Sequence, residues 1–267
     1  MKQYLSLFRI RFINSLQYRA TAYGGMVTQF FWGFMTLLLF RAFYKSGAAD
    51  FPMEFSRLSS YIWLQQAFLT LFMIWYFDMD IFNSITSGNV AYELARPVDL
   101  YKMWFTKNVA TRLSRATLRS FPILIVAALL PKPYGFSLPY SFTNFAMFLI
   151  TAVLAFLIVM AFCMLVYIST FYTMSSLGVR IVAAALSDFL TGGIIPLPFL
   201  PDNVQRIIGL TPFASMQNLP FLIYSGHIAG AEMFRGIMLQ VFWLAALVFI
   251  GRLWMNSALK RVVIQGG

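Results

Sequence analysis

Long apolar runs, separated by short polar or charged stretches, set the hydropathy pattern of this chain. A helix needs roughly 20 apolar residues to cross a bilayer, at 1.5 Å of rise each. The pattern predicts six such spans, at residues 22–43, 61–77, 107–130, 145–168, 177–195 and 234–255. The third is irregular, because Phe121–Leu130 is too short alone and must take in preceding turns that carry arginines. We therefore expect an all-α membrane protein with a single transmembrane domain over residues 1–267.

The stretch from Gly192 to Gly226, before the last predicted span, is apolar but rich in proline. It contains Pro196, Pro198, Pro201, Pro212 and Pro220. Proline removes a backbone donor and clashes with the carbonyl four residues earlier, so this stretch cannot be one helix. Broken backbone at membrane depth must be sheltered by protein or by water. Polar residues from Asp202 to Arg206 allow a turn back toward water, and we expect a re-entrant hairpin over 196–224.

Residues 2–19 have the pattern of a basic amphipathic helix. Their apolar side chains recur at helical spacing, at Leu5, Phe8, Phe12 and Leu16. Such a helix lies in the membrane interface. It is either a plain lipid anchor or a helix that also touches a cytoplasmic partner.

Residues 81–104 form the longest predicted cytoplasmic connection. Ser87-Gly88-Asn89 interrupts the chain, and Val90–Ala95 can then form a short helix. Pro97 ends it, because it disfavours the helical conformation at the preceding residue. Exposed side chains at Val90, Tyr92 and Leu94 would suit docking into a groove on another protein. The alternative is a structured loop packed on its own helix ends.

Composition agrees with a membrane protein. The chain is 60% hydrophobic and 11% charged, whereas soluble domains carry about a quarter charged residues. Its 20 lysines and arginines outnumber nine acidic residues, a bias that could indicate nucleic-acid binding. Apolar runs separate these charges, so a cytoplasmic bias explains them better. With six spans, fourteen of the twenty basic residues fall inside when both termini are cytoplasmic. We expect a multi-pass protein of the cell membrane that binds no nucleic acid.

Several chemistries lack the residues they need. The chain has one histidine, His227, and one cysteine, Cys163, so it offers no histidine–cysteine metal cluster and no internal disulfide. No lysine follows a glycine, so the phosphate-binding P-loop pattern is absent. We expect no enzymatic activity in this chain.

Three segments together resemble a known family. They are SLFRIRFINSLQYRA, SGNVAYELARPVDLY and GGIIPLPFLPDNVQRIIGLTPFASMQNLPFLIYSG. They resemble the permease subunits of type-2 ABC exporters, closest to a six-span uncharacterised branch, and the resemblance covers essentially the whole chain. It implies an elbow helix, a coupling helix after the second span and a hairpin before the sixth. It also implies a separately encoded ATPase dimer that binds ATP and magnesium, no cofactor in this chain, and a second permease subunit, identical or related.

The resemblance also assigns candidate site residues. The ATPase-coupling residues would be Val90, Ala91, Tyr92, Glu93, Leu94, Arg96 and Pro97. The candidates for the pathway or its gate are Arg112, Arg115, Arg119, Asp188, Pro196, Pro198, Pro201 and Pro212.

The charged candidates inside predicted spans leave alternatives open. The three arginines share one helix face and either snorkel to cytoplasmic headgroups or form an entry surface for an anionic or amphipathic substrate. Asp188 either meets another helix or faces water at the subunit interface. Gln29, Gln65 and Gln66 are expected to form hydrogen bonds between helices and not to bind substrate. Glu232 and Arg235 are expected to form a surface pair of small energetic weight.

Other functions remain possible. An ion-coupled secondary transporter would relay ions through intramembrane acids, but Asp188 is the only deep acid and no inverted repeat is visible. A membrane anchor that recruits a soluble partner would also use the 90–96 helix. An intramembrane enzyme is disfavoured by the missing histidine–cysteine cluster.

Overall fold

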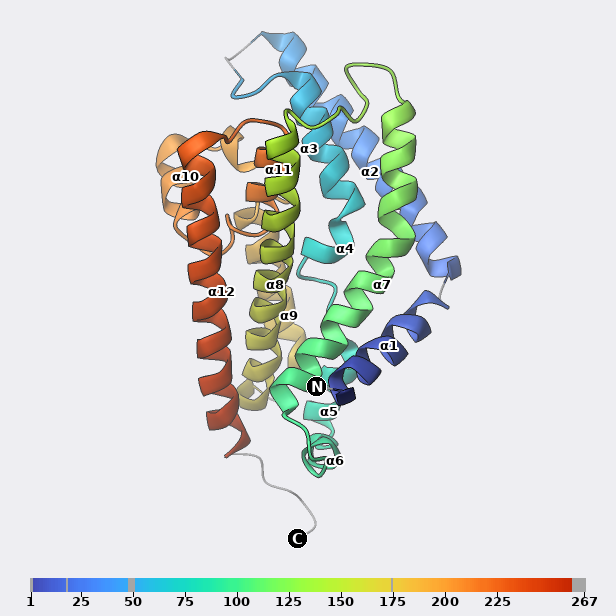
Figure 1. Ribbon diagram of the computed structural model, residues 1–267, viewed down its shortest axis with the longest axis vertical. Coiled ribbons are helices and arrows are strands. Elements are labelled where there is room, and N and C mark those ends of the chain that lie inside the picture. Colours follow the sequence, from blue (N-terminus) through green and yellow to red (C-terminus); the bar gives the residue numbers. More distant parts are fainter. Residues whose placement is uncertain (1, 18, 48–50, 174, 261–267) are drawn as a thin grey trace.

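The computed structural model describes residues 2–17, 19–47, 51–173 and 175–260, and these form helices without any strand (Figure 1). The elements are α1 (Lys2–Leu16), α2 (Arg19–Ser46), α3 (Phe55–Ala67), α4 (Leu69–Phe72), α5 (Met79–Thr86), α6 (Val90–Leu94), α7 (Leu100–Leu129), α8 (Phe142–Thr173), α9 (Ser176–Leu190), η1 (Leu197–Phe199), α10 (Asp202–Gly209), α11 (Asn218–Tyr224) and α12 (Gly230–Leu259). The expected all-α class is confirmed. Residue 18 of the predicted interfacial helix lies outside the described residues, as do residues 261–267.

The long helices run side by side along the molecule. Figure 1 shows α7, α8 and α12 along the long axis, with α5 and α6 at the end where α12 finishes; we call this the α6 end. Helix α8 is central, because α5, α7, α9, α11 and α12 all contact it. Within the described residues, three helices are long and apolar enough to cross a membrane: Ala22–Ser46, Phe142–Thr173 and Gly230–Leu259. They contain the predicted spans 22–43, 145–168 and 234–255.

The predicted span 61–77 is not one helix. Helix α3 ends at Ala67, α4 adds one turn, and Met73–Phe77 is not helical. Groups on α7 satisfy the carbonyls that this break releases. The Arg112 guanidinium donates to the Leu71 and Met73 carbonyls at 3.1 and 2.7 Å, and Ser120 donates to the Ala67 carbonyl at 2.7 Å. A cation beside carbonyls at a helix C-terminus also interacts favourably with the negative end of the helix dipole.

Two other predicted spans differ at their ends. Helix α7 covers the predicted span 107–130 except its last residue. It starts earlier, at Leu100, because the Asp99 carboxylate caps it by accepting from the Lys102 N–H at 2.7 Å. Helix α9 ends at Leu190, whereas the predicted span 177–195 continues further. The chain turns at Gly192, whose φ of 76° favours glycine.

The proline-rich stretch folds as short helices joined by non-helical backbone. Pro196 and Pro201 precede η1 and α10 directly, as expected for residues that cannot continue a helix. Pro220 lies in the first turn of α11, where its missing donor has no intrahelical acceptor.

Side-chain amides satisfy carbonyls of this irregular backbone. Gln65 donates to Gly193 at 2.7 Å, Gln205 to Leu200 at 2.7 Å, Gln217 to Thr191 at 3.4 Å and Gln240 to Ser215 at 2.8 Å. Buried backbone groups need such partners, and they need them most where water is scarce. The stretch is therefore tied to α3 and α12 as well as to itself.

Helix α1 packs along α7 near the α6 end (Figure 1). The Tyr4 hydroxyl accepts from the Asp99 N–H at 3.0 Å, and Arg11 pairs with Asp80 at 3.0 Å. The expected apolar face is only partly covered, since Phe8 and Phe12 are half-buried and Leu5 is exposed. Helix α1 therefore braces the start of α7 and leaves apolar surface open.

Candidate functional site

An open cavity of about 1200 Å³ lies beside α2 and is bordered by α3, α4, α9 and the residues after α9. Its apolar wall includes Trp32, Leu39, Phe43, Trp75 and Ile194. Its polar wall comprises Thr28, Gln29, Thr36, Gln65, Gln66, Tyr76, Arg119 and Asp188. The cavity can therefore accommodate a large, mainly apolar molecule that also carries polar groups.

Gln29, Gln66 and Asp188 in this wall carry buried polar atoms that form no hydrogen bond with the described part of the chain. Gln29 is 4% exposed, and neither its amide oxygen nor its amide nitrogen is hydrogen-bonded. The same is true of Gln66 Oε1 and Asp188 Oδ1. A buried polar atom without a partner costs roughly 1–3 kcal/mol. Water or a bound molecule in the cavity would supply the missing partners. Gln65, by contrast, bonds to backbone as expected, at Gly193.

Arg119 lines the cavity, and its guanidinium packs closely against Gly25 on α2. A Cβ atom at Gly25 would lie 2.5 Å from the Arg119 Cζ atom, so only glycine accommodates the guanidinium here. Arg119 also donates to the Tyr76 hydroxyl at 3.2 Å. Arg119 on α7 and Asp188 on α9 thus line one cavity with opposite charges.

The other two arginines have different places. Arg112 is 1% exposed and donates to the Leu71 and Met73 carbonyls, and its Nη2 lies 3.3 Å from the Cys163 sulfur. Snorkelling to headgroups is therefore wrong for Arg112, because its guanidinium is buried in the bundle interior and donates to backbone carbonyls there. Arg115 is half-buried and is not part of the cavity wall. The predicted three-arginine surface reduces to Arg119.

The prolines proposed as gate residues do not line this cavity. Pro196 and Pro198 are buried, Pro201 is exposed and Pro212 is half-buried. The cavity contacts their segment at Ile195 and Phe199 instead.

The short helix α6 projects from the end of the bundle where α12 finishes (Figure 1). Tyr92 is 75% exposed, and Leu94 and Arg96 are also exposed. The expectation that Val90 is exposed is wrong: it is 1% exposed and belongs to the hydrophobic core. Val90 therefore anchors α6, while Tyr92 and Leu94 face outward.

Glu93 fixes α6 to α7 from the helix's inner side. Its carboxylate accepts from Lys107 Nζ at 2.5 Å and from Trp104 Nε1 at 2.6 Å. Both partners lie on α7 and are buried, so the ion pair is largely shielded from water. Ala91 is half-buried and Pro97 is exposed. Of the predicted coupling residues, Glu93 holds α6 in place and Tyr92 and Leu94 present its surface.

The sequence predicts a surface pair between Glu232 and Arg235. Glu232 and Arg235 form no ion pair, and those found among the described residues are Arg11–Asp80 and Lys107–Glu93. Within the same described ranges, no group of three or more histidine, cysteine or acidic side chains could hold a metal ion.

Sequence reasoning missed the side chains that hold the irregular stretch. These side chains include Gln217, Gln240 and Asn144, and their carbonyl acceptors lie up to 89 residues away. An amide in an otherwise apolar run was the available signal.

Comparison with known families places these features in context. A family model described as an ABC-2 family transporter protein matches residues 12–266, nearly the whole chain. Comparison with individual curated proteins gave no match. The match agrees with the three helices that are long and apolar enough to cross a membrane among the described residues. The chain therefore belongs to the ABC-2 family of transporter proteins.

Proposed function

We propose that this chain is the permease subunit of an ATP-driven exporter with six membrane spans. The spans would be α2, α3 with α4, α7, α8, α9 and α12. Both termini would be cytoplasmic, and the 196–224 stretch would be a re-entrant hairpin on the outer side. Gln205 and Gln240 donate to carbonyls of this stretch, which supports the placement of its irregular backbone at membrane depth.

Helix α6 would be the coupling helix that docks on a separate ATPase. The observation that carries the proposal is its two-sided anchoring: Val90 and Glu93 are held inside while Tyr92 and Leu94 project. Because α6 is anchored to α7, a force that the ATPase exerts on its exposed face would move both helices together. ATP and magnesium would bind the ATPase, and this chain would convert its movement into access.

The large cavity would form half of the translocation path, with a second permease subunit completing it. Helix α7 connects the two functional regions. It carries Lys107, which binds α6, Arg112, which holds the broken α3–α4 segment, and Arg119, which lines the cavity. Lys107 and Arg119 are about 18 Å apart along the helix axis, at 1.5 Å per residue. A displacement of α6 would therefore move the cavity wall directly.

Co-purification with an ATPase tests this proposal. Affinity-tagged chain, extracted in mild detergent, should retain a P-loop ATPase whose activity co-elutes. Tyr92→Asp with Leu94→Asp should abolish this retention and leave the permease monodisperse. Leu138→Asp is the matched control, because Leu138 is exposed on the loop at the opposite end of the bundle. Equal loss in the control, or retention in the double variant, would contradict the coupling role of α6.

A secondary transporter remains a second candidate, because Asp188 Oδ1 is buried in the cavity without a partner. Transport by reconstituted protein should then follow an ion gradient without ATP. Transport that requires ATP and the ATPase excludes this candidate.

A further inference from the structure

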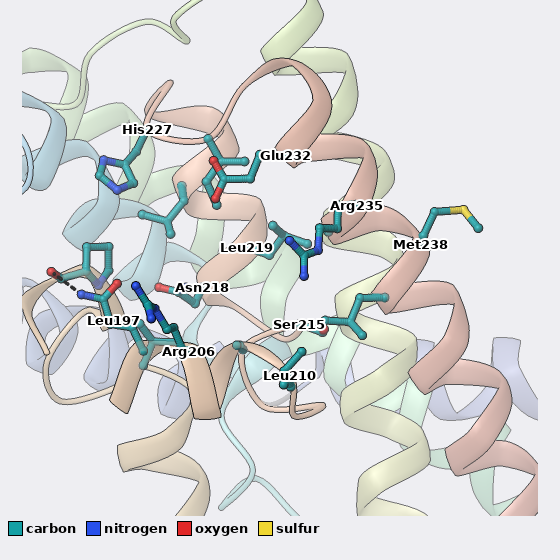
Figure 2. A pocket seen from close by; sticks show the side chains of 18 of the residues that line it. Leu197, Arg206, Leu210, Ser215, Asn218, Leu219, His227, Glu232, Arg235 and Met238 are labelled. Carbon is teal, nitrogen blue, oxygen red and sulfur yellow. Dashed lines mark hydrogen bonds between the residues drawn. The ribbon is translucent and has the colours of Figure 1, made fainter. Parts of the chain in front are cut away.

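A second pocket, of about 810 Å³, lies between α10, α11 and α12 (Figure 2). Figure 2 shows Arg206 on α10 and Arg235 on α12 at opposite sides of this pocket, with His227 and Glu232 above them and Leu210 below. This pocket is separate from the large cavity, and the two share no lining residue.

Three hydrogen-bond donors in this pocket have no protein acceptor within the described ranges. The guanidinium groups of Arg206 and Arg235 form no hydrogen bond, ion pair or ring contact there. Asn218 on α11 is 6% exposed, and its amide oxygen accepts from the Tyr61 hydroxyl at 3.0 Å. Its amide nitrogen remains available to a ligand. Two cations and an amide donor from three different helices favour an anion.

The pocket is polar at one end and apolar at the other. Along α12, Glu232 and Arg235 come first, and Met238 and Phe242 follow toward the α6 end. Arg235 and Phe242 are about 10 Å apart at 1.5 Å per residue. Leu210 continues the apolar wall, and its carbonyl accepts from Trp243 Nε1 at 3.0 Å. This order matches an amphipathic molecule whose charged group lies near the end of the bundle and whose chain extends toward its middle.

We propose that this pocket binds an amphipathic anion, with its phosphate or carboxylate between Arg206 and Arg235 and its apolar chain along Met238 and Phe242. An anionic membrane lipid supplies both parts. The proposal does not depend on ATP-driven export or on which subunit completes the translocation path. Glu232, the acid at the pocket mouth, weakens binding through repulsion.

Lipid retention by the full-length chain tests the proposal. The chain is extracted from vesicles of equal phosphatidylcholine and phosphatidylglycerol, and native mass spectrometry counts the lipids that remain bound. Wild type should retain phosphatidylglycerol in preference. Arg206→Gln with Arg235→Gln should reduce its apparent affinity roughly tenfold or more, because two charge-assisted hydrogen bonds are lost. Lys45→Gln, an exposed cation at the end of α2, is the control and should retain wild-type preference.

Glu232→Gln is a second test, in which lipid retention should increase and not decrease, so a folding defect cannot produce the expected result. Removing this acid should increase phosphatidylglycerol retention, and unchanged or weaker retention contradicts the proposal. Inorganic phosphate distinguishes the source of the anion. If phosphate protects lipid-free wild type, but not the double arginine variant, against thermal unfolding, the anion site is supported and is also filled from solution. If wild type and the double variant bind both probes equally, the proposal is overturned.

Discussion

Lys107 Nζ lies 2.5 Å from the Glu93 carboxylate and joins α6 to α7 by a shielded ion pair. The two side chains are 8% and 15% exposed, respectively. Breaking a buried pair by removing one partner costs about 3–5 kcal/mol, because the remaining charge is left uncompensated. Trp104 reinforces the contact by donating to the same carboxylate.

Removing one charge of this pair should loosen α6. Glu93→Gln should lower the thermal midpoint in detergent and weaken ATPase retention, while Glu93→Gln combined with Lys107→Gln should recover part of both losses. A double-mutant cycle measures the coupling. Additive losses would mean that the two residues act independently of each other.

Arg112 should matter for stability far more than its neighbour Arg115. Arg112→Met leaves the Leu71 and Met73 carbonyls unsatisfied, at roughly 1–3 kcal/mol each. Arg115→Met is the matched control, since Arg115 is half-buried on the same helix. Thermal unfolding followed by size-exclusion chromatography compares them. Equal destabilisation by the two changes would contradict the role assigned to Arg112.

The interactions of Arg112 could not be predicted from the sequence, whereas other parts of the fold could. The three apolar spans and α6 follow from local patterns, namely hydropathy and the breakers around Val90–Leu94. The break after Ala67 does not, because residues 61–77 contain neither proline nor glycine. It is stabilised by Arg112 and Ser120, which lie on another helix and were recognisable only as charge or polarity within a span.

The candidate site was predictable to a similar degree. Asp188 and Arg119 are recognisable because charges inside a span are costly, and both line the cavity. Gln29 looked like an interhelical hydrogen-bonding residue, yet its amide has no protein partner. The packing of helices that are distant in the sequence decides which polar residues pair and which face a cavity. The hydropathy pattern carries no information about this packing.

A methyl group at Gly25 should displace Arg119 and impair transport with little loss of folding. The added Cβ would meet the guanidinium at 2.5 Å. Gly24→Ala is the control, because nothing lies within 4 Å of a Cβ there, and alanine favours a helix by about 1 kcal/mol. Transport in vesicles and thermal midpoints should separate the two variants. Equal transport by both would show that the position of Arg119 is unimportant.

Asp188→Asn should change transport more than stability. The substitution removes a charge whose Oδ1 atom has no protein partner, so little folding energy is lost. Asp202→Asn, at the exposed start of α10, is the control. Substrate-stimulated ATPase activity of the reconstituted complex provides the measurement. A large drop in thermal midpoint for Asp188→Asn would instead assign Asp188 a structural role.

The pH dependence of stability should report on Asp78, which lies outside the proposed spans, between α4 and α5. Burial raises the pKa of its carboxyl, and Asp80 raises this pKa further, while Arg11, the hydrogen bond from the Asp80 N–H and Lys107 oppose the shift. The folded state therefore holds the proton to higher pH than the unfolded chain. The free energy of unfolding should fall as pH rises from the unfolded pKa, about 4, through the folded value, and then level off. Asp78→Asn removes this decline and keeps a side-chain oxygen for the Asp80 N–H. Thermal midpoints across this pH range, compared with Asp99→Asn at the start of α7, test the assignment. A decline that persists unchanged in Asp78→Asn would locate the titrating group elsewhere.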